Sequence, residues 1–136
     1  MRYDDLIGIP FRQFGRDRSG MDCYGLVLEC CRRSGRNLID LRRGLESLPA
    51  DLINDYISRG MNVRQISRPE PGCIVCTAYR RSLHIGYMTD KQNVLHATFD
   101  KGVRLSPLAV MRPIAFYEVI DESEFIQGTC RQEHPC

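Results

Sequence analysis

The chain lacks the features that mark membrane-spanning or exported proteins. No apolar run approaches the roughly 18–20 residues that a transmembrane helix needs, and the N-terminal residues 1–5 do not resemble a signal peptide. Internal repeats, low-complexity tracts and a clear domain linker are also missing. We therefore expect no membrane insertion and a protein that is cytoplasmic as synthesised, so that any site of action outside the cell requires a separate delivery route.

Net charge is also low, at +2 for 136 residues. This balance gives no support to a nucleic-acid partner. Hydrophobic residues make up 43% and charged residues 26% of the chain, which is close to the globular average. A chain of this size suits one core, so we expect a single domain over residues 1–120 and a polar C-terminal tail over 121–136.

The seven cysteines are an odd number without a secretory context, which favours reduced thiols over a disulfide framework. Cys73 and Cys76 have the spacing of a zinc-binding pair, and Cys130, His134 and Cys136 offer further ligands. However, the two residues between Cys73 and Cys76 are Ile and Val, which predict a strand in which positions three apart face opposite sides. We therefore expect neither a metal nor a cofactor, with a structural zinc as the alternative.

Hydrophobic periodicity divides the chain into helices followed by strands. A helical stripe covers residues 22–34 and ends at Gly35, and a second amphipathic helix is predicted over residues 52–57. Short strands are predicted at Cys73–Tyr79, His84–Met88, Val94–Phe99, Val103–Leu105 and Ile114–Ile120. Helices first and an antiparallel meander second indicate an α+β fold with a single sheet.

The most informative position is Cys23, which follows Asp22 and opens the first predicted helix. Aspartate is a favourable N-cap residue, and the unpaired N–H groups and positive dipole of a helix start favour a thiolate. Free cysteine titrates near ~8.5, and such surroundings can lower that value by several units. Cys23 is therefore a candidate nucleophile, whereas Cys30 and Cys31 near the end of this helix are predicted to lie in the core.

A cysteine nucleophile needs a general base, and the base needs a third group that fixes its tautomer. His84 and His96 can fill these roles, because a hairpin centred on Asp90 pairs them directly across two strands. Gly86 would leave room above the sheet for the thiol or the substrate backbone. A hairpin centred later, on a longer turn, would instead leave the histidines about three residues out of register.

Several ordered motifs, taken together, resemble a known family. They are Leu6-Ile7-Gly8-Ile9-Pro10-Phe11-Arg12, Gly20 to Val27, Pro71-Gly72, His84-Ile85-Gly86 and Leu95-His96-Ala97. Their order is similar to that of the NlpC family of bacterial cell-wall cysteine peptidases, which have a compact papain-like fold. The resemblance covers about residues 3–108. It implies an N-terminal nucleophile helix packed on a central antiparallel sheet.

The same resemblance implies a function and roles for individual residues. Members hydrolyse peptide bonds in the peptidoglycan stem, typically between D-glutamate and a diamino acid. Cys23 then corresponds to the nucleophile, His84 to the general base and His96 to the residue that orients it. Asp22 matches the acidic residue before the cysteine and, with Tyr24, supports the site. The backbone N–H of Cys23 is the expected oxyanion donor.

Three positions depart from the family pattern. Phe11 stands where an aromatic hydroxyl is common, and phenylalanine cannot donate a hydrogen bond. Tyr24 stands where serine is frequent, so its hydroxyl is a candidate replacement for the missing donor. Cys73 replaces an acidic residue. The loss of one oxyanion donor costs ~10²–10³ in rate in another hydrolase, so Phe11 bears on efficiency more than on mechanism.

The arginines around the predicted helix have two readings. They precede Cys23 or close its helix, at positions Arg12, Arg16, Arg18, Arg32 and Arg33. Such a group usually forms a solvated face, and the functional alternative is docking of a substrate that carries carboxylates.

Other roles remain open for the same residues. Short members without signal peptides are similar to proteins of phage tails and prophages, which makes phage tail proteins possible partners beside the peptidoglycan stem peptide. A toxin delivered into rival bacteria fits the sequence equally well. The alternatives are a non-catalytic tail-assembly protein that retains the fold and an acyl-transfer enzyme that uses the same triad.

Overall fold

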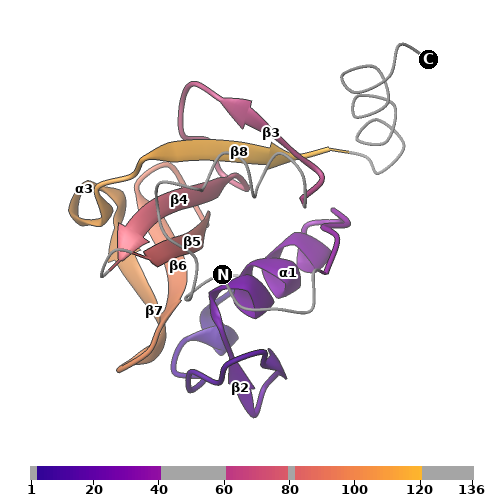
Figure 1. Cartoon of the computed structure of the whole chain (residues 1–136), viewed down its shortest axis with the longest axis vertical. Helices are drawn as coiled ribbons and strands as arrows, with labels where there is room; N and C mark the ends of the chain where they lie inside the picture. The colour runs from indigo at the N-terminus through magenta and orange to yellow at the C-terminus, as the bar shows by residue number, and fades with distance from the viewer. Residues whose placement is uncertain (1–2, 41–60, 80–81, 121–136) are drawn as a thin grey trace.

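A six-stranded antiparallel sheet forms the centre of the protein (Figure 1). The computed structural model describes residues 3–40, 61–79 and 82–120. The strands are β3 (Val63–Ile66), β4 (Ile74–Tyr79), β5 (Ser82–Met88), β6 (Asn93–Thr98), β7 (Gly102–Pro107) and β8 (Ala115–Val119). Every predicted strand is present with bounds shifted by one or two residues, and β3 is an additional strand.

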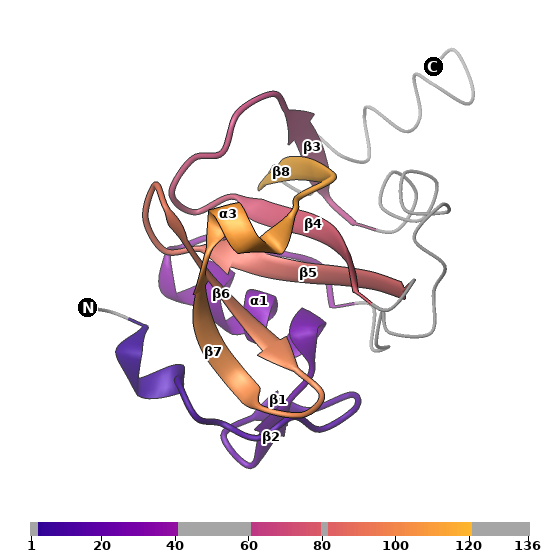
Figure 2. The same cartoon turned by 90° about the vertical axis from the view of Figure 1, so that its left-hand side faces the viewer.

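The strand order is β3-β8-β4-β5-β6-β7. The predicted meander therefore describes β4 to β7, but β8 returns to pair with β4, and β3 pairs with β8 at the sheet edge. A second, two-stranded ribbon joins β1 (Arg16–Asp17) to β2 (Gly20–Met21) and lies beside β7 (Figure 2). The expectation of a single sheet is thus incomplete, because this ribbon adds a small sheet directly before the nucleophile helix.

Helix α1 (Cys23–Arg33) matches the predicted helix. The Asp22 side chain caps its start by accepting the N–H of Gly25. After the C-cap Ser34, Gly35 adopts a φ of 81°, a left-handed conformation that favours glycine and ends the helix. The apolar face of α1 packs against β5 and β6, the two strands that carry the histidines.

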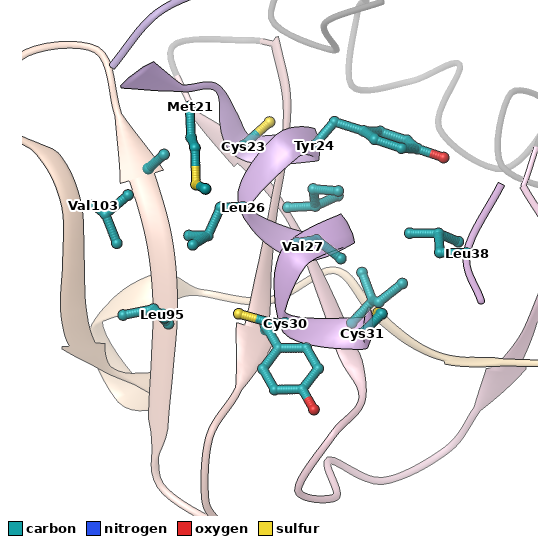
Figure 3. Packing of buried hydrophobic residues seen from close by; sticks show 14 of the residues in the cluster. Met21, Cys23, Tyr24, Leu26, Val27, Cys30, Cys31, Leu38, Leu95 and Val103 are labelled. Atoms are coloured by element: carbon teal, nitrogen blue, oxygen red, sulfur yellow. The ribbon is translucent and has the colours of Figure 1, made fainter. Parts of the chain in front are cut away.

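The sheet has a hydrophobic cluster on each face. Helix α1 covers one face, and α3 (Leu108–Met111) covers the other (Figure 2). On the α1 face, Met21 and Leu26 point toward Leu95 and Val103 (Figure 3). The clusters agree with period-two alternation along the strands, and they confirm the α+β class with its helix packed on an antiparallel sheet.

The N-terminal region begins with a short 3-10 helix, η1 (Asp4–Leu6), whose Leu6 is fully buried. The predicted helix over residues 52–57 and the predicted tail over residues 121–136 lie outside the described residues. Among the helices in the described part of the chain, none is long and apolar enough to cross a membrane.

Candidate active site

Cys23 is the first residue of α1 and is fully buried. It belongs to the same hydrophobic cluster as Ile85, Leu95 and Ala97, which are sequence neighbours of the two histidines. The helix start and the histidine-bearing strands are thus packed into one core. The N-terminal position of Cys23 agrees with the sequence prediction.

Asp22 does more than cap the helix. It is completely buried, and its Oδ1 accepts hydrogen bonds of 2.8 Å from the N–H of Gly25 and from Nη1 of Arg16. Its Oδ2 accepts the N–H of Phe14 at 2.9 Å. One carboxylate therefore joins the helix start to the loop and ribbon before it, which fixes the backbone on both sides of Cys23.

His84 and His96 meet through their ring nitrogens. Nε2 of His84 lies 3.0 Å from Nδ1 of His96, and the rings are nearly perpendicular, with an interplanar angle of 75°. Both residues are buried, with exposed fractions of 5% and 6%. The structure therefore brings together the two histidines that the sequence singled out.

The register that produces this contact differs from the prediction. Tyr87 pairs with Leu95 and Met88 with Val94, so the hairpin is centred one residue later than Asp90 and the histidines are diagonal neighbours. They still share a face because this shift changes each pairing by two positions, which preserves the alternation.

The turn explains the shift. Asp90 Oδ1 accepts the N–H groups of Gln92 and Asn93, and the N–H of Thr89 bonds to the carbonyl of Asn93. This Asx-type arrangement makes the turn longer than in the hairpin centred on Asp90 that the sequence suggested.

The space next to Gly86 is occupied, whereas we expected it from the sequence to be open. A Cβ atom at this position would lie 2.5 Å from Cγ1 of Val94 and 3.2 Å from Cβ of His96. The space above Gly86 is therefore filled by side chains of β6 and is not an opening for the thiol or the substrate. Glycine is needed here because it lets the strand with His96 approach β5 closely.

A third polar residue, Ser106, joins the pair. Its Oγ lies 2.8 Å from Nε2 of His96, and Ser106 is 6% exposed. In the register between β6 and β7, His96 pairs with Arg104 and Val94 with Ser106, so Ser106 is again a diagonal neighbour on the same face. Sequence reasoning missed Ser106. The turn residues Asp100-Lys101-Gly102 between the two strands are the signal that could have placed position 106 on that face.

Burial keeps both imidazoles uncharged at neutral pH. Loss of solvent lowers the pKa of His84 to about 3, with the nearby His96 as a second cause. Burial also lowers the pKa of His96 to about 4, and the positive charge of Arg104 adds to this effect. Each ring therefore carries a single proton, and the hydrogen-bond partners decide which nitrogen holds it.

Three other cysteine thiols of the core have raised pKa values, whereas an activated thiol has a lowered one. Burial raises the pKa of Cys30 and Cys76 and raises that of Cys31 to about 12. Cys30 and Cys31 are fully buried, as predicted for core residues. These three cysteines are thus packing residues that stay protonated at neutral pH.

Tyr24 does not supply the donor that Phe11 lacks. Its hydroxyl donates to the carbonyl of Ile39, and the ring extends away from Cys23 toward the side of α1 where Leu38 lies (Figure 3). Arg16 stacks over the ring at 5.6 Å from its centroid. The phenol is therefore held by the segment after α1, and the support that Tyr24 gives is to the packing of the helix.

Phe11 lies close to the helix start. It forms an isolated backbone bridge with Met21, two residues before Cys23, and its ring packs at 5.3 Å from that of Phe99. Phe99 is 74% exposed. Near the helix start, Phe11 thus presents a ring that cannot donate a hydrogen bond, packed against a second ring of the same kind.

Of the five arginines that the sequence places around α1, four are paired with carboxylates. Arg16 pairs with Asp22 and Asp40, and Arg18 and Arg33 share Asp5. Arg32 pairs with Glu29, while Arg12 donates to the hydroxyl of Ser19. These contacts favour the structural reading of the arginines over substrate docking.

Cys73 and Cys76 belong to different clusters, on opposite faces of the sheet. Their side chains diverge as the strand prediction required, so they do not form two corners of one zinc site. Within residues 3–40, 61–79 and 82–120, no group of three or more metal-binding side chains is found. Cys130, His134 and Cys136 lie outside the described residues.

Comparison with known proteins supplies the family. The NlpC/P60 family model matches residues 8–122. Among solved structures, the chain is similar to the NlpC/p60 domain of the peptidoglycan hydrolase SagA, with a TM-score of 0.56 and 16% identity over 85% of this chain and 91% of that one. The structural match confirms the expected papain-like fold. No curated protein matches the chain. Because the family model covers most of its length, the protein belongs to the NlpC/P60 family.

Proposed function

We propose that this protein is a cysteine peptidase that cleaves the peptidoglycan stem at the bond between D-glutamate and a diamino acid. The observation that carries the proposal is the bonded pair of His84 and His96 on two strands packed against the helix that Cys23 opens. Family membership and a fold shared with a peptidoglycan hydrolase domain support a substrate in the bacterial cell wall.

Cys23 is the proposed nucleophile and His84 the general base. A neutral imidazole can accept the thiol proton, and burial keeps His84 neutral by lowering its pKa to about 3. Nε2 of His84 is bonded to His96, so the proton from Cys23 is assigned to Nδ1. As Sγ attacks the scissile carbonyl, this transfer gives an imidazolium that His96 stabilises through the Nε2 hydrogen bond.

The remaining steps follow the chemistry of an acyl-enzyme. His84 returns its proton to the leaving amine, the peptide C–N bond breaks, and a thioester to Cys23 remains. Water then attacks the thioester with His84 as base, which releases the acid and restores the thiol. The developing oxyanion is assigned to the backbone N–H of Cys23, because first-turn N–H groups lack acceptors within the helix.

Access is part of this mechanism because Cys23 is fully buried. Substrate binding has to move neighbouring side chains aside before a carbonyl carbon can meet Sγ. Contacts with the rest of the substrate have to supply the energy for this displacement.

A synthetic stem peptide tests the assignment of the bond. Incubation of L-Ala-D-isoglutamyl-diaminopimelic acid with the wild-type protein is expected to release free diaminopimelic acid, detected by mass spectrometry. The Cys23→Ala variant serves as the matched control and should release none. Cleavage only between L-Ala and D-glutamate would contradict the assigned bond.

A further inference from the structure

Ser106 extends the histidine pair to a chain of three bonded side chains. Nε2 of His84 bonds to Nδ1 of His96 at 3.0 Å, and Nε2 of His96 bonds to Oγ of Ser106 at 2.8 Å. All three residues are at most 6% exposed, so these contacts do not compete with bulk water. The side chains come from β5, β6 and β7, and they line up across one face of the sheet.

The chain of bonds can carry its protons in two ways. In one, His84 donates from Nε2 to His96, His96 donates from Nε2 to Ser106, and Nδ1 of His84 holds a lone pair. In the other, Ser106 donates to His96, His96 donates from Nδ1 to His84, and Nδ1 of His84 carries the proton. Only the first arrangement leaves His84 able to accept a proton from Cys23.

The surroundings of His96 single out Ser106 as the partner of its Nε2. Arg104 is the direct cross-strand neighbour of His96, but a guanidinium carries donors and no acceptor. The positive charge of Arg104 also opposes a second proton on His96, which keeps this ring neutral. A neutral His96 has one N–H, and the hydroxyl of Ser106 is the acceptor placed to hold it on Nε2.

We propose that Ser106 is a positioning residue that accepts the Nε2 proton of His96 and thereby fixes the tautomers of both histidines in the form that leaves Nδ1 of His84 unprotonated. This inference rests on the proposed function for its consequence in catalysis. It acts through His96 and requires no contact between Ser106 and the substrate.

Two measurements test the proposal. Histidine-selective ¹⁵N nuclear magnetic resonance of the resting protein is expected to show His96 protonated on Nε2 in the wild type and a gain of the Nδ1-protonated form in Ser106→Ala. The same variant is expected to lose about 10- to 100-fold in kcat, with KM nearly unchanged, because general acid–base catalysis contributes 10²–10⁴-fold in total. Ser106→Thr keeps the hydroxyl and should restore both properties.

Thr98→Val is the matched control, because it also removes a buried hydroxyl. Thr98 lies on β6, and its hydroxyl bonds to the carbonyl of Gly102 and not to an imidazole. It should leave the tautomer of His96 and kcat unchanged. If Ser106→Ala does not fold, Ser106→Cys, whose sulfur is a weak acceptor, takes its place.

An unchanged His96 tautomer in the serine variant would overturn the proposal, even if kcat falls, because the loss would then be structural. The resonance experiment needs no turnover. A protein that cleaves no peptidoglycan would therefore refute the proposed function, while the tautomer result would still decide the role of Ser106.

Discussion

Nε2 of His84 and Nδ1 of His96 are 3.0 Å apart although the two residues are diagonal neighbours and not direct cross-strand partners. Diagonal positions on one face are within reach of long or aromatic side chains. The contact joins two buried imidazoles whose pKa values are both lowered, and this combination has consequences for activity and for stability.

Replacement of His96 tests the orienting bond. We expect His96→Leu to lose about 10²- to 10⁴-fold in kcat on a stem peptide, since His84 would lose the partner that holds its tautomer. His96→Asn keeps an oxygen that can accept from His84 and should lose less. Steady-state kinetics, with thermal melts to verify folding, compare the two. Equal activity of His96→Leu and the wild type would contradict the assignment.

The buried histidines also predict how stability depends on pH. Unfolded histidine titrates near ~6.5, whereas the folded pKa values are about 3 for His84 and about 4 for His96. As pH falls below about 6.5, the two histidines bind protons in the unfolded chain but stay neutral in the folded one. The stability present at neutral pH is therefore lost toward pH 4. Urea unfolding at pH 7, 6 and 5 measures this loss.

Ion-paired carboxylates add to this loss only at lower pH. The pKa values of Asp5 and Glu29 are lowered, mainly by hydrogen bonds from Arg33 and Arg32 respectively, so their effect begins near the unfolded carboxyl values of about 4. The interval between pH 7 and pH 5 therefore reports mainly on histidine. His84→Gln/His96→Gln should show a smaller decline there, and an equal decline would refute the explanation.

The start of α1 was predictable because its signals are local. Asp22, the apolar stripe after it and Gly35 lie within one short segment, and each acts through the neighbouring backbone. Strand β3 was not predicted, since it is a four-residue segment, half of it polar, at the sheet edge and is stabilised by pairing with β8, which is distant in sequence.

The candidate site was predictable in part for similar reasons. A shift of the pairing by two positions leaves His84 and His96 on the same face of the sheet. The contact was therefore predicted although the register was wrong. Ser106 belongs to no motif, and only the pairing of β6 with β7 brings it to His96. The hydrogen-bond partner of the Tyr24 hydroxyl is the carbonyl of Ile39, in the segment after α1. No local sequence pattern predicts where that segment lies.

Asp22 is expected to contribute to stability as well as to the placement of Cys23. Asp22→Ala removes the helix cap and leaves the N–H of Phe14 and one contact of Arg16 without their acceptor. We expect a loss of about 2–4 kcal/mol in the free energy of unfolding. Asp22→Asn retains a capping oxygen and should lose less. Urea unfolding of both variants makes the comparison, and unchanged stability of the alanine variant would contradict the bonding described.

Gly86 should tolerate no side chain while Val94 is present. In Gly86→Ala the new Cβ would collide with Cγ1 of Val94, and we expect a loss of about 1–3 kcal/mol in unfolding free energy. A double variant with Val94→Ala should be less destabilised than the sum of the single changes, because the collision is relieved. Strict additivity of the two losses would show that the close approach of β5 and β6 is not the cause.

Digestion of purified peptidoglycan by the wild type and by Cys23→Ala, with mass analysis of the released fragments, tests the central claim most directly. The chemistry assigned to Cys23 predicts that the wild type releases fragments cut after D-glutamate, with a new amino group on the diamino acid, and that Cys23→Ala releases none. Release of the same fragments by both proteins would show that Cys23 is not the nucleophile.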